Sequence, residues 1–357
     1  MRFFLPIPLL VACNPPDANQ DTDEGAPEVD VCETLGLPGS FSDVEEEYQD
    51  FEAFAFQEGE LAMGLFEDGE IDALYAKFSD DVKQIVTLQD MFDIYDQIIG
   101  VAPLGKQKDL RSMGASRLMY FSATYKWNTL TLNFQFAFDK DGNIGGFGIK
   151  TMTNPLPEPH ADYESKVVMQ LPFDCLWYTV WGGRQELYNY HTYYAPGAYA
   201  YDFLVWDDGG TCAEPCEDND DYYIFGLPIL APAAGLVVGA EDGNPDMPPN
   251  VADPQSVTGN HVMLEVAPGE YLLLAHMQNG TVAVEVGDEV DAGQQLGLVG
   301  NSGNTTQAHL HMHLQDQDTY NANAKSIPMD FSKLNINGTY FEKAMPVGSE
   351  FVESAWK

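Results

Sequence analysis

The sequence predicts two domains of different fold class, a smaller α+β domain followed by a larger all-β domain. The chain has 357 residues, which is enough for two domains. In its first half, helical periodicity gives way to alternating apolar and polar runs, which predicts helices followed by antiparallel strands. In its second half, turn residues separate short strand-like runs at even intervals. That spacing is typical of an antiparallel sandwich or barrel and not of a parallel sheet.

The amino-terminal residues 1–12 are predicted to be a signal peptide. Arg2 supplies a positive charge, and the apolar run Phe3–Val11 is too short to span a bilayer. The run ends in LVAC, which resembles the cleavage box of bacterial lipoproteins. This resemblance implies that Cys13 becomes the first mature residue and carries a lipid that anchors the protein to a membrane. An ordinary signal peptide with an incidental cysteine is the alternative, and both interpretations predict export.

A tether and the α+β domain are expected next. Residues 13–43 are predicted to be a flexible acidic tether, because its first half is rich in Asp, Glu, Asn and Pro. The α+β domain is expected at 44–153, and the turn sequence DKDG at 139–142 indicates a hairpin within it. Its predicted helices are Tyr48–Phe66, Ile71–Phe78 and Met91–Ile99, and its predicted strands are Leu118–Lys126, Thr129–Phe138 and Ile144–Met152.

The Pro-rich run Asn154–Pro159 marks the boundary to the all-β domain. This domain is expected at 154–345, with a C-terminal tail at 346–357. The stretch ILAPAAGLVV at 229–238 is predicted to be a pair of strands bent at its proline and glycine. Two hairpins are also predicted, His261–Val266 with Tyr271–His276, and Val286–Val290 with Gly293–Gly297.

The cysteines predict disulfide bonds. Without Cys13, the chain has Cys32, Cys175, Cys212 and Cys216. An even number of cysteines in an exported protein indicates disulfides, and three pairings are open. The close spacing of Cys212 and Cys216 favours a bond between them, which leaves Cys32 with Cys175. A cysteine zinc site is the alternative, but this spacing is unlike a paired CxxC knuckle.

The composition is strongly acidic. Sixteen Lys and Arg residues against 56 Asp and Glu residues give a formal net charge of -40. Such a surface repels nucleic acid and anionic lipid headgroups, so neither is expected as a partner. Solubility or adaptation to salt explains the charge without any recognition function.

The segment AHLHMHL at 308–314 carries three of the seven histidines, His309, His311 and His313. Alternate side chains of a strand point to the same face, so these imidazoles are expected to line one face. Imidazole is the commonest metal ligand among side chains, so the pattern indicates a zinc site. The polar face of an edge strand is the alternative.

A catalytic zinc takes three protein ligands and leaves a fourth position open, so further ligands are expected upstream. The sequence offers His191 in NYH and Asp202 in YAYDF. A carboxylate in such an apolar and aromatic strand is costly unless it is paired or bound to a metal. His191 alone is the weaker candidate, because a histidine among tyrosines is commonly a hydrogen-bonded surface residue.

The region from about 191 to 314 resembles the lysostaphin-type zinc endopeptidases, which cleave bacterial peptidoglycan. The matching stretches occur in the family's order and are YAYDF (199–203), PILAPAAGLVV (228–238), GNHVMLE (259–265), YLLLAHM (271–277), VGDEVDAGQQLGLVGNSGNT (286–305) and AHLHMHL (308–314). The layout of 44–153, with GEIDALYAKFSDDVK at 69–83, resembles the small cone-shaped domains of the nuclear-transport-factor-2 type that precede some bacterial hydrolases.

The resemblance to the endopeptidases implies a set of site residues. By position, the zinc ligands fall on His191, Asp202 and His311, and the catalytic histidines fall on His276 and His309. Zinc lowers the pKa of a bound water and polarises the scissile carbonyl, while the two histidines move protons and stabilise the oxyanion. Which histidine accepts the proton stays open.

Two departures from the family's pattern bear on the ligands. The family usually separates its first histidine and its aspartate by three residues, whereas ten separate His191 from Asp202, so His160 is a second candidate for that ligand. His313 stands where the family often has Glu or another polar residue. It is expected to orient a neighbouring ligand or to face solvent, and not to bind the metal itself.

The sequence thus predicts an exported zinc metalloendopeptidase that hydrolyses peptide bonds of cell-wall peptidoglycan. We expect it in the periplasm or at the cell surface, held to the envelope by the lipid on Cys13. The domain at 44–153 is expected to position the enzyme, to cover its groove or to bind a regulatory protein partner. A non-catalytic regulator of other wall hydrolases is the alternative. Zinc storage is a third hypothesis, and it requires a closed site with four protein ligands.

Overall fold

The computed structural model describes residues 32–355, with gaps at 33, 35, 102–108, 116–117, 128–129, 153–159 and 161. The predicted signal peptide, Cys13, most of the predicted tether and the Pro-rich joint therefore lie outside the described residues. The described residues belong to one compact unit of the chain. None of the helices described is long and apolar enough to cross a membrane.

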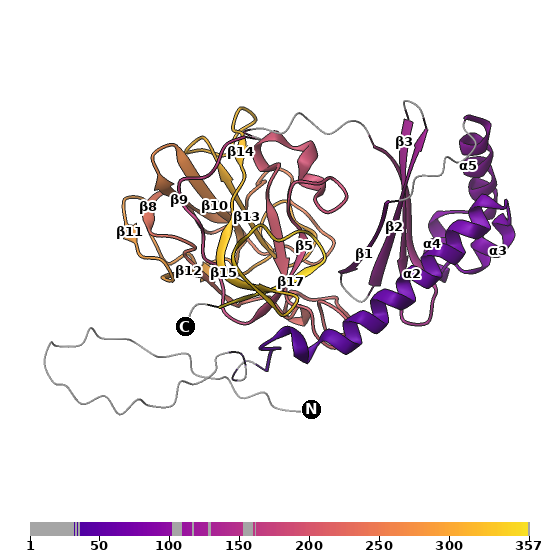
Figure 1. The fold of residues 1–357 in the computed structure, drawn as a ribbon, viewed down its shortest axis with the longest axis horizontal. Coiled ribbons are helices and arrows are strands. Elements are labelled where there is room, and N and C mark those ends of the chain that lie inside the picture. Colours follow the sequence, from indigo (N-terminus) through magenta and orange to yellow (C-terminus); the bar gives the residue numbers. More distant parts are fainter. Residues whose placement is uncertain are drawn as a thin grey trace, which may run out of the picture. The chain divides into compact units, whose positions relative to one another are not determined.

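The first part of the described chain is a four-stranded antiparallel sheet with helices on one face (Figure 1). Its helical elements are η1 (Phe41–Asp43), α2 (Glu45–Glu67), α3 (Ile71–Ala76), α4 (Asp80–Ile85) and α5 (Leu88–Val101), and its strands are β1 (Asp109–Ala115), β2 (Leu118–Trp127), β3 (Leu130–Phe138) and β4 (Ile144–Met152). The strand order is β1-β2-β3-β4, so each strand pairs with the next one along the chain. Helices α2 and α4 contact the sheet, and α5 packs on α3.

Aromatic packing holds α2 against this sheet. The rings of Phe66 in α2 and Phe134 in β3 meet edge to face, with their centroids 5.2 Å apart, and both side chains are fully buried. Each buried aromatic side chain removes about 150–250 Å² from water. Gly59 of α2 lies directly over the ring of Phe121, where a Cβ would come within 2.1 Å of the ring. The missing side chain is therefore what lets helix and sheet approach.

The three helices and three strands predicted for this part are confirmed, with no end shifted by more than three residues. Two elements, α4 and β1, are additional. Helix α4 has six residues, and Ser79 caps it by accepting a hydrogen bond from the amide of Val82 at 3.3 Å. Strand β1, with the sequence DLRSMGA, lacks a regular alternation of apolar and polar residues. The resemblance to nuclear-transport-factor-2-type domains stays a prediction.

The second part of the described chain is β-rich. Its helical turns are η2 (Tyr190–Tyr193), η3 (Ala195–Gly197) and η4 (Asn219–Asp221), and its strands are β5 (Leu176–Trp181), β6 (Tyr201–Leu204), β7 (Pro228–Leu230), β8 (Gly235–Glu241), β9 (Asn260–Ala267), β10 (Glu270–Met277), β11 (Glu289–Val290), β12 (Gln295–Leu298), β13 (Leu310–Gln315), β14 (Ser326–Ile327), β15 (Phe331–Ile336), β16 (Thr339–Ala344) and β17 (Glu350–Ser354). Eleven strands form one sheet in the order β11-β8-β9-β10-β13-β6-β5-β17-β15-β16, with β14 beside β13. Strands β12 and β7 form a separate pair. The antiparallel, β-rich character is as predicted, whereas a sandwich or barrel stays a prediction.

One predicted hairpin is confirmed, and two predicted pairings are wrong. Strands β9 and β10 pair with each other as expected. Strands β7 and β8, predicted as a pair, lie in different sheets, because β7 pairs with β12 and β8 pairs with β9 and β11. Strands β11 and β12 do not pair with each other either. Turn residues mark where a strand ends, but packing across the whole domain selects its partner.

Two predicted boundaries are also wrong. Phe41 lies in the predicted tether, yet its ring packs on Phe351 of β17 with centroids 5.3 Å apart, and Tyr48 packs on the same ring at 4.8 Å. Strand β17 itself lies in the predicted C-terminal tail and pairs with β5 and β15. Burial of these apolar side chains explains both corrections, because the short segments that carry them complete the core of the β-rich part.

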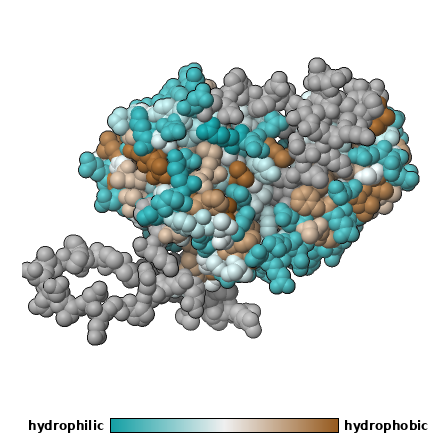
Figure 2. All heavy atoms as spheres, in the orientation of Figure 1, coloured by the Kyte–Doolittle hydropathy of each residue, from teal (hydrophilic) through white to brown (hydrophobic). Residues whose placement is uncertain are grey.

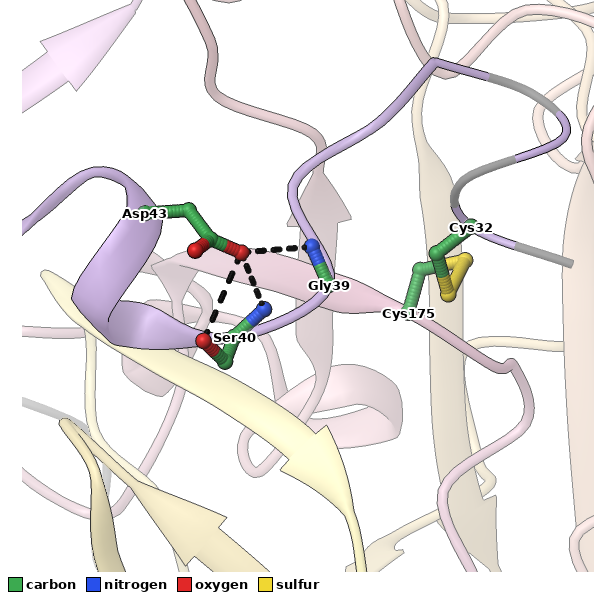
Figure 3. The surroundings of a disulfide bond; sticks show 5 residues. All are labelled: Cys32, Gly39, Ser40, Asp43 and Cys175. Carbon is green, nitrogen blue, oxygen red and sulfur yellow. Dashed lines mark hydrogen bonds between the residues drawn. A yellow bond between two sulfur atoms is a disulfide. The ribbon is translucent and has the colours of Figure 1, made fainter. Parts of the chain in front are cut away.

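Both disulfides favoured by the cysteine spacing are present, Cys32–Cys175 and Cys212–Cys216. Figure 3 shows the first bond beside the loop that leads into α2. In this loop a carboxylate oxygen of Asp43 accepts hydrogen bonds from the backbone amides of Gly39 at 3.0 Å and Ser40 at 2.9 Å. The bond and the loop together hold the start of the described chain beside β5.

Loss of the Cys32–Cys175 bond is expected to lower the free energy of unfolding more than loss of the Cys212–Cys216 bond. The two bonds join cysteines separated by 143 and 4 residues. The loop-entropy relation gives about 5 kcal/mol for the long loop and about 2 kcal/mol for the short one. Urea unfolding of the two double Cys→Ser variants measures this difference. A larger loss in the Cys212→Ser/Cys216→Ser variant would contradict the expectation.

Hydrophilic side chains cover much of the face drawn in Figure 2, and hydrophobic side chains form smaller patches between them. This distribution agrees with the large excess of Asp and Glu over Lys and Arg. Most large apolar side chains of the described residues are instead buried in cores beneath the helices and within the β-rich part.

Candidate metal and catalytic centre

Strand pairing brings an aspartate and a histidine face to face near the middle of the large sheet. Strands β6 and β13 are antiparallel neighbours, and their register places Asp202 opposite His311. On the other side of β13, strand β10 places Ala275 opposite His311, and His276 is the next residue along β10. His191 comes from the turn η2, and its ring centroid lies 5.1 Å from that of His311.

The alternation predicted for the histidine segment is present in β13. Leu310, Met312 and Leu314 are fully buried in the core of the β-rich part. His311 and His313 alternate with them and lie side by side, with their ring centroids 5.2 Å apart. His309 directly precedes the strand. The period of two therefore places the apolar side chains on one face of the strand and the histidines on the other.

These side chains line a cleft of about 460 Å³. The polar part of the lining contains His191, Asp202, His276, His309 and His311. Aromatic side chains from Trp181, Tyr190, Tyr194 and Tyr320 form another part of it. A cleft of this size, with a few polar groups among apolar and aromatic ones, is typical of a ligand-binding site.

A buried amide holds His191. Asn189 is fully buried, and its Nδ2 donates hydrogen bonds to the carbonyl oxygens of Gly183 at 2.8 Å and Ala200 at 3.0 Å. The opposite amide orientation would set an oxygen against these two acceptors. The Oδ1 atom therefore accepts a hydrogen bond from Nδ1 of His191 at 2.9 Å. This leaves a lone pair on Nε2 of His191, which lies 3.5 Å from Oδ2 of Asp202.

A second amide holds His311 through His313. The Nε2 atom of Gln315 donates to two backbone carbonyl oxygens, at 2.7 and 3.0 Å, so its Oε1 accepts from Nε2 of His313 at 2.9 Å. His313 then offers the lone pair of its Nδ1 to the Nε2–H of His311 at 3.0 Å. The Nδ1 atom of His311 is left without a proton, 2.8 Å from Oδ1 of Asp202.

Backbone carbonyls hold the other two imidazoles. The Nδ1 atom of His276 donates to the carbonyl oxygen of Ser302 at 2.8 Å, and Nδ1 of His309 donates to that of Gln307 at 2.9 Å. Nε2 of His276 is thereby left as a proton acceptor, whereas Nε2 of His309 lies 3.5 Å from Oδ1 of Asp202. Gly259 lets the Ser302 carbonyl come close, because a Cβ at this position, where φ is +55°, would lie 2.2 Å from the carbonyl oxygen.

Burial and neighbouring charges set the protonation of these groups. Burial lowers the pKa of His191 to about 4 and that of His313 to about 3, and it holds the pKa of His276 well below its usual value. Burial alone would raise the pKa of Asp202, but the surrounding histidines hold it well below its usual range. Burial likewise opposes the charged form of His309, yet Asp202 raises the pKa of His309 above its usual value. At neutral pH the centre thus sets an ionised Asp202 carboxylate among the neutral imidazoles of His191, His276 and His313.

The donor atoms fit a zinc ion. Lone pairs of His191 and His311 and the carboxylate of Asp202 converge with no proton between them, and such acceptors repel one another unless a cation lies among them. Within the described residues, two groups bring their ligand atoms within 4.8 Å, namely His191, Asp202 and His311, and His276, His309 and His311. The first group is the better fit, because two histidines and a carboxylate are a known ligand set of catalytic zinc.

The structure brings together all five residues that the sequence singled out for metal binding and catalysis. The ten residues between His191 and Asp202 contain the end of turn η2 and the whole of turn η3, which return the chain to β6. The second candidate, His160, instead pairs with Asp316, with Nε2 and Oδ2 3.1 Å apart. His160 belongs to neither of the two groups above. His313 does not face solvent, because its side chain is fully buried.

Sequence reasoning did not identify Asn189, Gln315 or the Ser302 carbonyl as parts of the centre. Gln315 continues the alternation of His311 and His313, so the period of two carries a signal for it. Asn189 shows no comparable pattern, because its role depends on two carbonyl groups that the fold brings to it. A backbone carbonyl has no sequence signal at all.

Several solved structures are similar to parts of the chain. A chain of the SpoIIQ-SpoIIIAH pore-forming complex is 23% identical over 35% of this chain and 60% of its own length, with a TM-score of 0.23. The solution structure of lysostaphin is 22% identical over 35% of this chain and 39% of its own length, with a TM-score of 0.23. A mutant catalytic domain of the prophage-encoded M23 protein EnpA from Enterococcus faecalis is 24% identical over 48% of this chain and 93% of its own length, with a TM-score of 0.22. The chain thus spans less than two thirds of the first two structures.

The family comparison is more specific. No curated protein is similar enough to the chain to count as a match. The family model described as Peptidase family M23 matches residues 222–323. This range contains His276, His309 and His311, and it begins after His191 and Asp202. Residues 222–323 therefore form a domain of Peptidase family M23.

Proposed function

We propose that this protein is an exported, zinc-dependent endopeptidase that hydrolyses peptide bonds of bacterial peptidoglycan. The Peptidase family M23 domain supports peptidase activity, and that family typically acts on peptidoglycan. The two disulfides support a location outside the cytoplasm, where such bonds form and persist. The proposal also includes a lipid on Cys13 as the envelope anchor and a regulatory protein as the partner of the α+β part.

The observation that carries this proposal is the convergence of three proton-free ligand atoms in one cleft. Nδ1 of His311 lies 2.8 Å and Nε2 of His191 lies 3.5 Å from the carboxylate of Asp202. Three protein ligands are the number used at catalytic zinc, whereas storage or structural sites use four. Two histidines that also line the cleft are then free for chemistry.

In the proposed reaction, His191, Asp202 and His311 hold the zinc, which when bound lowers the pKa of water and polarises the scissile carbonyl. The nitrogens available for proton transfer are the Nε2 atoms of His276 and His309, because each Nδ1 is occupied by a backbone carbonyl. One of these Nε2 atoms takes the proton of the attacking water and returns it to the nitrogen of the leaving amine. A protonated Nε2 also donates a hydrogen bond to the developing oxyanion.

Removal of metal from the purified protein tests this function. We expect one zinc ion per chain by atomic absorption, and new amino groups when the protein is incubated with purified peptidoglycan. A chelator should abolish the release of amino groups, and added zinc should restore it, because hydrolysis depends on the metal. Zinc bound without any release of amino groups would overturn the peptidase and favour the regulator. A protein that takes up no zinc would overturn both the metal and the reaction.

A further inference from the structure

We propose that Asn189 and the pair His313–Gln315 are positioning residues that decide which ring nitrogen each ligand histidine presents to the metal. The inference rests on the proposed function, because it takes His191 and His311 as ligands. All three residues are fully buried, and none of them lines the cleft. Their role is therefore exerted through the histidines and not on a substrate.

The two ligand histidines need opposite tautomers. His191 faces Asp202 with Nε2, whereas His311 faces it with Nδ1. A neutral imidazole carries its proton on either nitrogen, and a partner at the other nitrogen decides which. Oδ1 of Asn189 accepts a hydrogen bond from Nδ1–H of His191, and Nδ1 of His313 accepts one from Nε2–H of His311. Each ligand thus has a partner on the side away from Asp202.

Both partners are themselves fixed in one orientation. The amide nitrogens of Asn189 and Gln315 each donate to two backbone carbonyl oxygens, at 2.7 to 3.0 Å. If His313 instead carried its proton on Nδ1, the lone pair of its Nε2 would face Oε1 of Gln315 at 2.9 Å with no proton between them. In a fully buried site no water replaces the lost hydrogen bond, so the reversed arrangement is disfavoured.

The hydrogen bond from His311 to His313 matters because His311 could instead donate a hydrogen bond to Asp202. Oδ1 of Asp202 lies 2.8 Å from Nδ1 of His311, a distance at which an Nδ1–H would donate directly to the carboxylate. That bond would occupy two of the three ligand atoms at once. By holding the proton on Nε2, His313 keeps the Nδ1 lone pair and the carboxylate available to a cation. Asn189 does the same for Nε2 of His191.

Variants of His313 separate hydrogen bonding from packing. In His313→Asn the side-chain Oδ1 takes the place of Nδ1, because both atoms are two bonds from Cβ, so the acceptor for His311 is retained. In His313→Leu a carbon atom stands there. We expect His313→Leu and Asn189→Leu each to weaken zinc binding about 10–100-fold, the usual effect of losing a partner of a metal-binding histidine. We expect His313→Asn to recover most of that loss. His160→Leu, a matched variant at a histidine outside the cleft, should bind zinc as the unmodified protein does.

The direct test is long-range ¹H–¹⁵N NMR of the zinc-loaded, histidine-labelled full chain, with zinc affinity measured by chelator competition. We expect metal on Nε2 of His191 and on Nδ1 of His311, with the remaining proton on the other nitrogen of each ring. Metal on Nε2 of His311, or unchanged affinity in His313→Leu, would overturn the inference while leaving the peptidase intact. Zinc bound as expected without any turnover of peptidoglycan would instead overturn the proposed function alone. A chain that binds no zinc would overturn both. The spectrum of the unmodified protein decides the tautomers even if a variant fails to fold.

Discussion

Replacement of His311 by alanine is expected to abolish zinc binding and, with it, the hydrolysis of peptidoglycan. His311 belongs to both groups of side chains that could hold a metal among the described residues. Without it, His191 and Asp202 remain, one ligand fewer than catalytic zinc sites use. Loss of a mere partner of a metal ligand costs about 10–100-fold in affinity, so loss of the ligand itself should cost more than about 100-fold. Chelator competition and the release of amino groups from peptidoglycan measure the two effects.

A matched control for this variant is His160→Ala. His160 is also a histidine within reach of an aspartate, with Nε2 3.1 Å from Oδ2 of Asp316, but it does not line the cleft. The His160→Ala variant should still bind zinc and still hydrolyse peptidoglycan. If His311→Ala bound zinc as tightly as the unmodified protein, the metal would have to lie elsewhere and the ligand set would be refuted.

Replacement of His276 or His309 by alanine is expected to lower turnover by about 10²–10⁴-fold, the range typical of a positioned acid or base. Zinc content should stay unchanged, because neither residue belongs to the proposed ligand group of His191, Asp202 and His311. Atomic absorption and turnover are measured on the same preparation. Loss of zinc from both variants would contradict this division of roles and move the metal to the group of His276, His309 and His311.

The sequence could predict much of this centre because its strongest signals are local. The alternation of AHLHMHL follows from the geometry of a single strand, so the division between apolar side chains on one face and histidines on the other needs no knowledge of the fold. Asp202 was recognisable because a carboxylate in an apolar strand requires a partner, whatever that partner is. The order of the matching stretches then supplied the remaining histidines.

What the sequence did not predict depends on contacts between distant segments. Strand β7 pairs with β12 and not with β8, although only four residues separate β7 from β8. Phe41 and Phe351 meet from opposite ends of the chain, so neither the end of the tether nor the last strand was recognisable. Asn189 acquires its role from two carbonyl groups that have no side-chain signature. In each case the partner is chosen by tertiary packing.

The Cys32–Cys175 bond changes the covalent path through the molecule. Helices α2 to α5 and strands β1 to β4 all lie in the chain between these two cysteines. Tension applied to the chain ahead of Cys32 would therefore pass through the disulfide directly into β5. The α+β part lies in the closed loop between the two cysteines and would not bear this tension. A single cut in that loop would not separate the β-rich part from the amino-terminal segment until the bridge was reduced. The covalent connection between the chain ahead of Cys32 and the histidine-lined cleft is thus independent of whether the α+β part stays folded.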